Sequence, residues 1–244
     1  MTVSPDSGIV LTDASYTVAG KVILSGLSLT LTEARIGIVG RNGSGKSTLL
    51  RLMAGLIPAT SGTVRVDGID PARDRKAMLA RLGILFQNPD HQILFPTVEE
   101  ELAFGLHQMG HSTGAAREAV RALLVSEGRA HWAAAPTQTL SQGQRHYLCL
   151  LAVLLMAPGT ILLDEPFAGL DLPTQGRLAR RLAALPQRLV TISHDPASVA
   201  GCDRVIWLDA GRVRADGPAG PVLAAFVDEM ARLGDLDADA DFDR

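Results

Sequence analysis

The feature that most restricts the fold of this chain is the octapeptide GRNGSGKS at residues 40–47, which matches the pattern G-x-x-x-x-G-K-[ST]. It follows a short apolar run at residues 36–39 and leads into a segment with helical spacing at residues 46–56. Glycines allow the backbone to curl so that consecutive N–H groups point at phosphate oxygens, and the start of the helix adds partial positive charge. This order of strand, loop and helix predicts an α/β fold built around a phosphate site.

The residue types of this loop indicate how phosphates would be held. We expect Lys46 to reach the β- and γ-phosphates of a nucleotide and the Ser47 hydroxyl to ligate Mg²⁺. The alternative, a glycine-rich turn without a ligand, is disfavoured by the strand and helix that flank the loop. The residues expected to surround the phosphates are Asn42, Gly43, Ser44, Gly45, Lys46, Ser47 and Thr48.

Two adjacent carboxylates, Asp164 and Glu165, end an apolar strand predicted at residues 160–163. Neighbouring side chains on a strand diverge, so the pair is expected to divide its tasks. Asp164 would bind Mg²⁺, directly or through its waters, and Glu165 would orient or deprotonate an attacking water. In the alternative interpretation the two acids merely cap the turn at Pro166.

Apolar periodicity organises the rest of the chain. Further strands are predicted at residues 9–12, 22–31, 63–66, 84–86, 188–192, 205–208 and 212–214. Helical spacing covers residues 98–106, 115–124, 142–156 and 174–185. Strands that alternate with helices predict a mostly parallel sheet covered on both faces, with an antiparallel β part at the N-terminus and an inserted helical subdomain.

Length and composition limit the other possibilities. The 244 residues predict one domain, with a nucleotide-binding core at residues 1–87 and 157–234, a helical subdomain at 88–156 and a frayed acidic tail at 235–244. With 23 basic and 26 acidic residues, the net charge of −3 gives no case for a nucleic-acid partner. The longest apolar run, residues 148–158, has 11 residues, and a spanning helix needs roughly 20. Without a secretory signal at its start, the chain is expected to stay in the cytoplasm.

The segment Leu140-Ser141-Gln142-Gly143-Gln144 precedes the apolar helix predicted at residues 142–156, and Ser141 with Gln144 has the spacing of a capping box. The pattern alone is equally consistent with an ordinary helix cap. Placed 23 residues before Asp164, however, it resembles the signature of ABC-type ATPases, and the match covers nearly the whole chain. This resemblance implies a P-loop NTPase core of RecA-like type, ATP as the nucleotide, and contacts to it from Ser141, Gly143 and Gln144.

Four more residues acquire roles from the same resemblance. Gln87 corresponds to the Q-loop glutamine, which reaches the metal and senses the γ-phosphate and a membrane partner, and Asp171 lies in a D-loop. His194 resembles the switch histidine at the γ-phosphate, and Tyr16 the aromatic ring that stacks on adenine. Gln87 and His194 have the alternative of being polar strand ends, and Tyr16 of being a half-buried strand residue. Two positions depart from the family pattern: Gln142, more often glycine, and Arg35, more often acidic.

The signature implies two chains. A helix over residues 142–156 extends roughly 22 Å, at 1.5 Å per residue, away from Ser141. The signature is therefore not expected to fold back onto the phosphate loop of its own chain. A second copy or a paralogous chain would supply it, with two ATP molecules between the two subunits.

Residues 86–105 resemble the ATPase subunits of energy-coupling-factor (ECF) importers, which take up vitamins and transition-metal ions. This implies a transmembrane coupling protein, a substrate-binding membrane protein and a place at the cytoplasmic face of the membrane. The acidic residues Glu99, Glu100 and Glu101 would supply charge for an Arg-bearing coupling helix, or simply stabilise the first turn of their own helix.

The short C-terminus, with an amphipathic run at residues 221–233, and the sequence around His91 favour biotin uptake over cobalt or nickel uptake. The alternative from another class is an ABC-type ATPase that acts on DNA or ribosomes. That class would need long coiled-coil heptads or a second nucleotide domain, and neither is present in this sequence.

Overall fold

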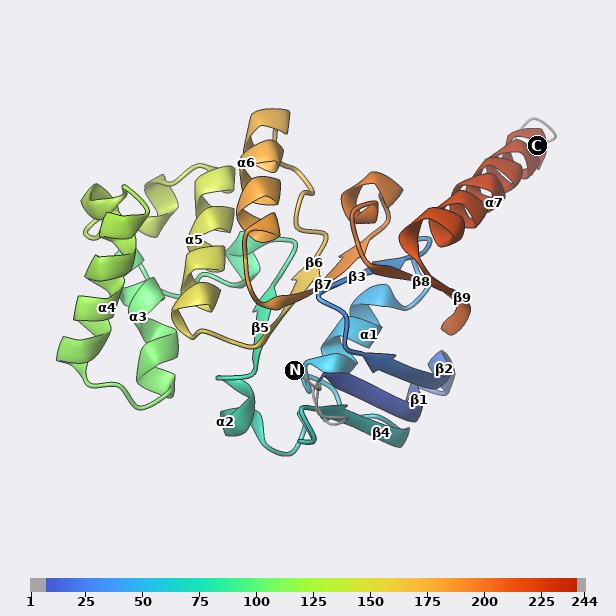
Figure 1. Cartoon of the computed structure of the whole chain (residues 1–244), viewed down its shortest axis with the longest axis horizontal. Helices are drawn as coiled ribbons and strands as arrows, with labels where there is room; N and C mark the ends of the chain where they lie inside the picture. The colour runs from blue at the N-terminus through green and yellow to red at the C-terminus, as the bar shows by residue number, and fades with distance from the viewer. Residues whose placement is uncertain (1–7, 241–244) are drawn as a thin grey trace.

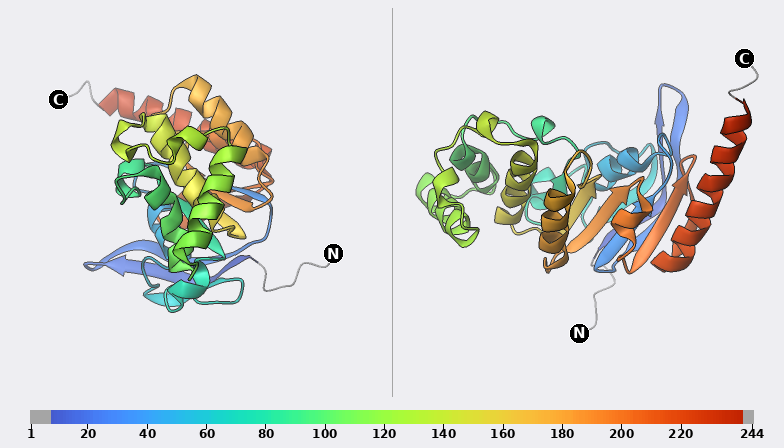
Figure 2. Two further views of the ribbon diagram at one scale, coloured as in Figure 1. Left: turned by 90° about the vertical axis from the view of Figure 1, so that its left-hand side faces the viewer. Right: turned by 90° about the horizontal axis from the view of Figure 1, so that it is seen from above.

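The computed structural model describes residues 8–240. Three helices, α3 to α5, lie at one end of the molecule, a central sheet lies in the middle, and α7 lies at the opposite end (Figures 1 and 2). A second, smaller sheet faces the central one across α1 (Figure 1). The α/β class predicted from the sequence is confirmed.

The central sheet has the strand order β5-β6-β7-β3-β8-β9. Its first five strands are parallel and β9 pairs antiparallel with β8. Parallel strands covered on both faces read as continuous apolar runs, which is the pattern of the predicted strands. The bounds are β3 (Arg35–Val39), β5 (Leu82–Leu85), β6 (Thr160–Asp164), β7 (Arg188–Ser193), β8 (Arg204–Asp209) and β9 (Arg212–Gly217).

The smaller sheet is antiparallel, in the order β2-β1-β4, with β1 (Ile9–Val18), β2 (Lys21–Leu31) and β4 (Ser61–Val66). Strand β1 is longer than the predicted residues 9–12. Asp13 has a φ of 47° and the register to β2 shifts between Leu11 and Tyr16, so the apolar alternation is interrupted there although pairing continues.

Helix α1 (Lys46–Met53) is buried between the two sheets, in one apolar core with residues of both. It ends three residues before the predicted end because Gly55 turns the chain with a φ of 68°. The short α2 (Arg75–Met78), capped by Asp74, gave no periodic signal in the sequence.

The segment between β5 and β6 is helical, with η1 (Pro89–His91), α3 (Val98–Gln108), α4 (Thr113–Ser126), η2 (Ala130–Trp132), η3 (Thr137–Thr139) and α5 (Gln142–Leu155). One apolar cluster is formed by α3, α4 and one side of α5, including Leu148 and Leu151. The other side of α5, with Leu150 and Val153, packs with the sheet and with α6 (Leu172–Ala183). Helix α5 therefore joins the helical part to the sheet.

At the other edge, η4 (Pro196–Val199) and α7 (Ala219–Ala240) cover β8, and Trp207 meets Phe226 edge to face with ring centroids 5.4 Å apart. The expectation of a frayed tail is wrong for residues 235–240, because α7 continues through them to Ala240. The rest of that predicted tail, residues 241–244, lies outside the described residues. Among residues 8–240, no helix combines the length and apolar character needed to cross a bilayer.

Arg35, a departure from the family pattern, has a structural role. Its guanidinium donates hydrogen bonds to the carbonyl oxygens of Ala183, Leu185 and Gln187, where α6 ends and β7 begins. A cation at the C-terminal end of a helix satisfies carbonyls that have no partner within the helix.

Replacing Leu162 with alanine tests this core. Leu162 is fully buried on β6 in the cluster that surrounds α1. Truncating such a side chain leaves a cavity, so the free energy of unfolding should fall by about 2–5 kcal/mol. Denaturant unfolding followed by circular dichroism measures the change. Val125→Ala, at a position 61% exposed, is the control and should stay within about 0.5 kcal/mol of the parent chain; equal losses in both variants would refute the assignment of Leu162 to the core.

Candidate active site

A cleft of about 490 Å³ lies at the carboxyl ends of the parallel strands, where open α/β sheets bind their ligands. It brings together residues from the phosphate loop, from the ends of β5, β6 and β7, and from the β1–β2 hairpin. The residues that line it are Lys21, Ile23, Asn42, Gly43, Gly45, Lys46, Ser47, Thr48, Gln87, Glu165 and His194. Nine of these eleven are among the site residues predicted from the sequence.

The phosphate loop has the tight conformation that its glycines permit. Gly45 caps α1 with a φ of 103°, and a Cβ at Gly40 would lie 2.2 Å from the carbonyl oxygen of Leu208. The loop is fixed from behind because the Gly211 N–H donates a hydrogen bond to the Ser44 carbonyl oxygen at 3.0 Å. Ser44 itself is buried, and its side chain does not line the cleft, unlike its neighbours on either side.

The Lys46 side chain folds back over the phosphate loop that precedes it. Its Nζ donates hydrogen bonds to the carbonyl oxygens of Gly40 at 2.6 Å and Arg41 at 3.0 Å. Burial lowers the pKa of the Lys46 ammonium, and the carboxylates Glu165 and Asp164 act in the opposite direction. The first turn of α1 thus places a cation beside two anions.

Asp164 ends β6 beneath the loop. Burial, and next the charge of Glu165, raise the pKa of the Asp164 carboxyl, whereas Arg51, Lys46 and a hydrogen bond from Ser47 favour its ionised form. Its Oδ1 atom is buried without a hydrogen-bond partner among the described residues. A buried carboxylate oxygen without a donor, next to a serine hydroxyl, fits the oxygen coordination that Mg²⁺ prefers.

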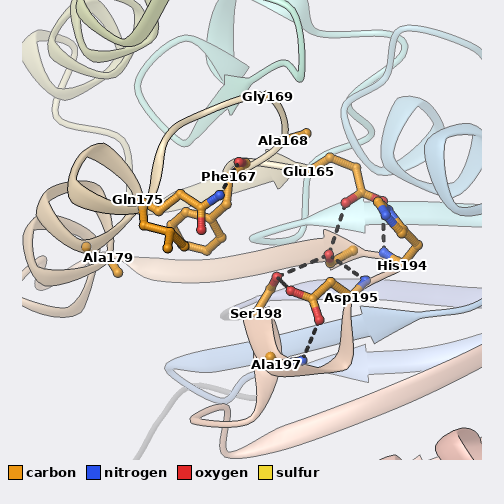
Figure 3. Close-up of a pocket in the computed structure, with 13 residues that line it drawn as sticks. Glu165, Phe167, Ala168, Gly169, Gln175, Ala179, His194, Asp195, Ala197 and Ser198 are labelled. Atoms are coloured by element: carbon orange, nitrogen blue, oxygen red, sulfur yellow. Dashed lines mark hydrogen bonds and ion pairs between the residues drawn. The ribbon is translucent and has the colours of Figure 1, made fainter.

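Glu165 and His194, predicted to act separately, are in direct contact (Figure 3). The His194 imidazole Nδ1 and backbone N–H each lie 2.8 Å from Glu165 Oε1, and the Ser193 hydroxyl lies 3.0 Å from Oε2. The contact arises because β6 and β7 are neighbours with Asp164 opposite Ile192. Glu165 has a φ of 48°, an uncommon conformation for a residue with a side chain, and its N–H donates to the Ile192 carbonyl oxygen.

The signature segment has the predicted cap. The Ser141 side chain accepts a hydrogen bond from the Gln144 N–H, and the Gln144 side chain accepts one from the Ser141 N–H at 2.8 Å. A Cβ at Gly143 would lie 2.9 Å from the Thr174 methyl group, so α5 and α6 touch here. Gln142, the other departure from the family pattern, lies beside Gly169 of the loop before α6.

The structure does not bring the signature to the phosphate loop of the same chain. Ser141, Gly143 and Gln144 line a different pocket of about 400 Å³, between α5 and α6. Asp171 is exposed and caps α6 by accepting a hydrogen bond from the Thr174 N–H at 2.8 Å. Hydrogen bonding to the Thr174 side chain, and next to this N–H, lowers the pKa of the Asp171 carboxyl.

Tyr16 also lies outside the lining of the cleft. It pairs with Leu24 on β2 and packs half-buried against the core around α1. The hairpin residues that do line the cleft, Lys21 and Ile23, were missed in the sequence because no motif marks them and only the folding of the hairpin brings them there.

Three acidic residues begin α3: Glu99, Glu100 and Glu101. Glu101 is buried, and its carboxylate accepts hydrogen bonds from the N–H groups of Leu94 and Phe95 at 2.8 and 2.9 Å. Glu99 pairs with Arg117 at 2.9 Å. Glu101 therefore fixes the loop before its own helix, and its carboxylate is not exposed for a partner.

Known relatives agree with this geometry. Residues 24–168 match the model of the ABC transporter family. The chain is 50% identical over 214 residues to the biotin transport ATP-binding protein BioM of Rhodobacter capsulatus. The aligned residues make up 88% of this chain and 92% of that protein. Its identity to the BioM of Rhizobium etli is 38%, over 87% of this chain and 95% of that protein.

Solved structures give the same family. With cbiO1 from Clostridium perfringens, part of the ABC transporter complex cbiONQ, the TM-score is 0.77 at 30% identity, over 90% of this chain and 91% of that one. With the dimeric structure of MJ0796, a bacterial ABC transporter cassette, the TM-score is 0.72 at 26% identity, over 86% of this chain and 98% of the MJ0796 chain. The chain therefore belongs to the ABC transporter family, as one of its ATP-hydrolysing subunits.

Proposed function

We propose that this chain is the ATP-hydrolysing motor of an ECF-type importer that takes up biotin, bound to transmembrane partners at the cytoplasmic face of the membrane. The assignment of biotin as the solute depends on the 50% identity to a biotin transport ATP-binding protein over 88% of this chain. Cobalt or nickel uptake is the second candidate. The segment at residues 86–105, with Gln87 exposed at the edge of the cleft, is the proposed link to the coupling protein.

In this proposal the cleft holds the triphosphate of ATP. The backbone N–H groups from Asn42 to Thr48 surround the phosphates, and Lys46 exchanges its two carbonyl acceptors for phosphate oxygens. The base lies towards the β1–β2 hairpin, where Tyr16 is half-buried and Ile23 lines the cleft.

Hydrolysis needs a water aligned with the γ-phosphate. Glu165 accepts a proton from this water as its oxygen bonds to the γ-phosphorus and the bond from that phosphorus to the β-phosphate oxygen breaks. His194, whose Nδ1 lies against the same carboxylate, is the residue proposed to contact the γ-phosphate. The backbone conformation of Glu165 directs its carboxylate over the end of β7.

The proposed Mg²⁺ ligands are Ser47, Asp164 and Gln87. The Asp164 oxygen without a donor and the serine hydroxyl beside it support this assignment. When bound, the ion would neutralise charge on the β- and γ-phosphates. Asp164 has to be ionised to bind the metal, and its burial makes this ionisation unfavourable.

The site is completed by a second ATPase chain, identical or paralogous. Within one chain the signature and the phosphate loop line separate pockets. Ser141, Gly143, Gln144 and Asp171 are proposed to act on the nucleotide of the neighbouring subunit, as a closed pair requires. Loss of the shared γ-phosphate would then loosen the pair and drive the membrane subunits.

Uptake measurements test the proposed solute. The chain is expressed with its candidate coupling and substrate-binding membrane proteins, and uptake of labelled biotin, cobalt and nickel is followed in intact cells. Biotin accumulation that disappears in Lys46→Ala supports the proposal. Accumulation of a metal ion alone, dependent on the same lysine, would favour the second candidate instead.

Glu165→Gln tests the catalytic assignment. The amide keeps the size of the side chain but cannot take a proton, so ATP binding should persist while the rate of hydrolysis falls by about 10²–10⁴-fold. Phosphate release and equilibrium binding of labelled ATP measure the two quantities. Glu118→Gln, exposed on α4, is the matched control and should hydrolyse ATP normally; a Glu165→Gln protein that does the same removes Glu165 from this role.

Asp164→Asn separates function from stability. Folding raises the pKa of the Asp164 carboxyl. The folded state therefore loses stability as the pH rises from the pKa of this carboxyl in the unfolded chain through its pKa in the folded chain. Without nucleotide, the asparagine variant should therefore melt at a higher temperature than the parent at neutral pH and at the same temperature in acid. Its ATP hydrolysis should fall by about 100-fold or more, because a metal ligand is lost. A lower melting temperature at neutral pH would show that the charge of Asp164 stabilises the fold.

A further inference from the structure

The proposed function leaves one neighbour of Glu165 without a task. Ser193 is the last residue of β7, is only 2% exposed, and its hydroxyl lies 3.0 Å from Glu165 Oε2. A polar side chain this deeply buried is expected to be fully hydrogen-bonded. Its hydroxyl carries a single proton, which only one acceptor can take.

Three groups compete for the Ser193 hydroxyl. The Asp195 N–H lies 3.0 Å away and can only donate, so Ser193 accepts there. Glu165 Oε2 at 3.0 Å and the Ser198 hydroxyl at 3.4 Å are the two possible acceptors of its proton. A carboxylate is the stronger and nearer acceptor.

Ser198 does not donate to Ser193. The Ser198 hydroxyl lies 3.0 Å from Asp195 Oδ2, which only accepts, so the proton of Ser198 is taken by Asp195 (Figure 3). The Ser198 oxygen can therefore only accept from Ser193, and at 3.4 Å it is a more distant and uncharged acceptor than Glu165 Oε2 at 3.0 Å. The Ala197 N–H holds the other oxygen of Asp195 at 3.0 Å, which keeps that carboxylate in place.

We propose that Ser193 is a positioning residue that donates its proton to Glu165 Oε2, with the Asp195 N–H bound to the serine oxygen and holding it in place. This rests on the proposed function, in which Glu165 acts on the attacking water. With His194 on Oε1 and Ser193 on Oε2, the carboxylate is held at both oxygens. The His194 N–H and the Ser193 hydroxyl occupy one acceptor position on each oxygen, which leaves acceptor capacity for the water.

Substitution of the two serines tests this. In Ser193→Ala, kcat should fall about 10-fold or more while KM for ATP stays within about 2-fold, because a hydrogen bond to a charged group is lost without a contact to ATP. Ser193→Thr keeps the hydroxyl and should regain most of kcat. Ser198→Ala removes only the more distant acceptor and should keep kcat within about 2-fold of the parent; a loss as large as that in Ser193→Ala would contradict donation to Glu165. Ser126→Ala, exposed on α4 with its hydroxyl on the Leu123 carbonyl, should change neither constant.

A double-mutant cycle distinguishes positioning from a structural effect. In the Glu165→Gln background, Ser193→Ala should not lower the single-turnover rate further, since the group it positions is already lost. A further loss by the same factor would overturn the inference while leaving the role of Glu165 intact. Normal hydrolysis by Glu165→Gln alone would overturn both. If Ser193→Ala fails to fold, as its melting temperature would reveal, Ser193→Cys replaces it: the thiol is a weak donor of similar size, so kcat should again fall, and unchanged kcat overturns the inference.

Discussion

The burial of α1 between the two sheets is the constraint on which the rest of the structure depends. Leu49, Leu50, Leu52 and Met53 are each at most 1% exposed, and they join residues of both sheets in one core. A helix fixed on several sides cannot shift along its axis without opening cavities. Its N-terminus is therefore held rigidly, together with the phosphate loop and the lysine that begins it.

The parallel strands supply the acidic side of the cleft with similar precision. Because β6 and β7 are paired in register, the residues that follow them, Glu165 and His194, meet at one edge of the sheet. The cation of Lys46 and the two carboxylates are thus delivered by strands and a helix far apart in the sequence. Burial works against their charges, and this cost is accepted where charge is used for chemistry.

The sequence was sufficient for features that local geometry determines. The phosphate loop, the carboxylate pair and the Ser141 cap each depend on a few consecutive residues, and the structure has them where they were predicted. Features that depend on pairing between distant segments could not be predicted from the sequence. These are the long β1 with its irregular register, Lys21 and Ile23 at the cleft, and the contact of Ser193 with Glu165. Tyr16 and Ser44 show the reverse, since the family resemblance and the loop motif indicated them and neither is among the residues that line the cleft.

The central claim is that each site is completed by the signature of another chain, and purified mixed dimers test it most directly. One dimer joins a Lys46→Ala chain to a Ser141→Arg chain; the other joins a chain with both changes to an unchanged chain. If each site combines the phosphate loop of one chain with the signature of the other, the first dimer keeps one intact site and the second keeps none. Only the first dimer should then hydrolyse ATP, at about half the parental rate if the two sites act independently. Hydrolysis by the second dimer and not by the first would mean that each chain works alone.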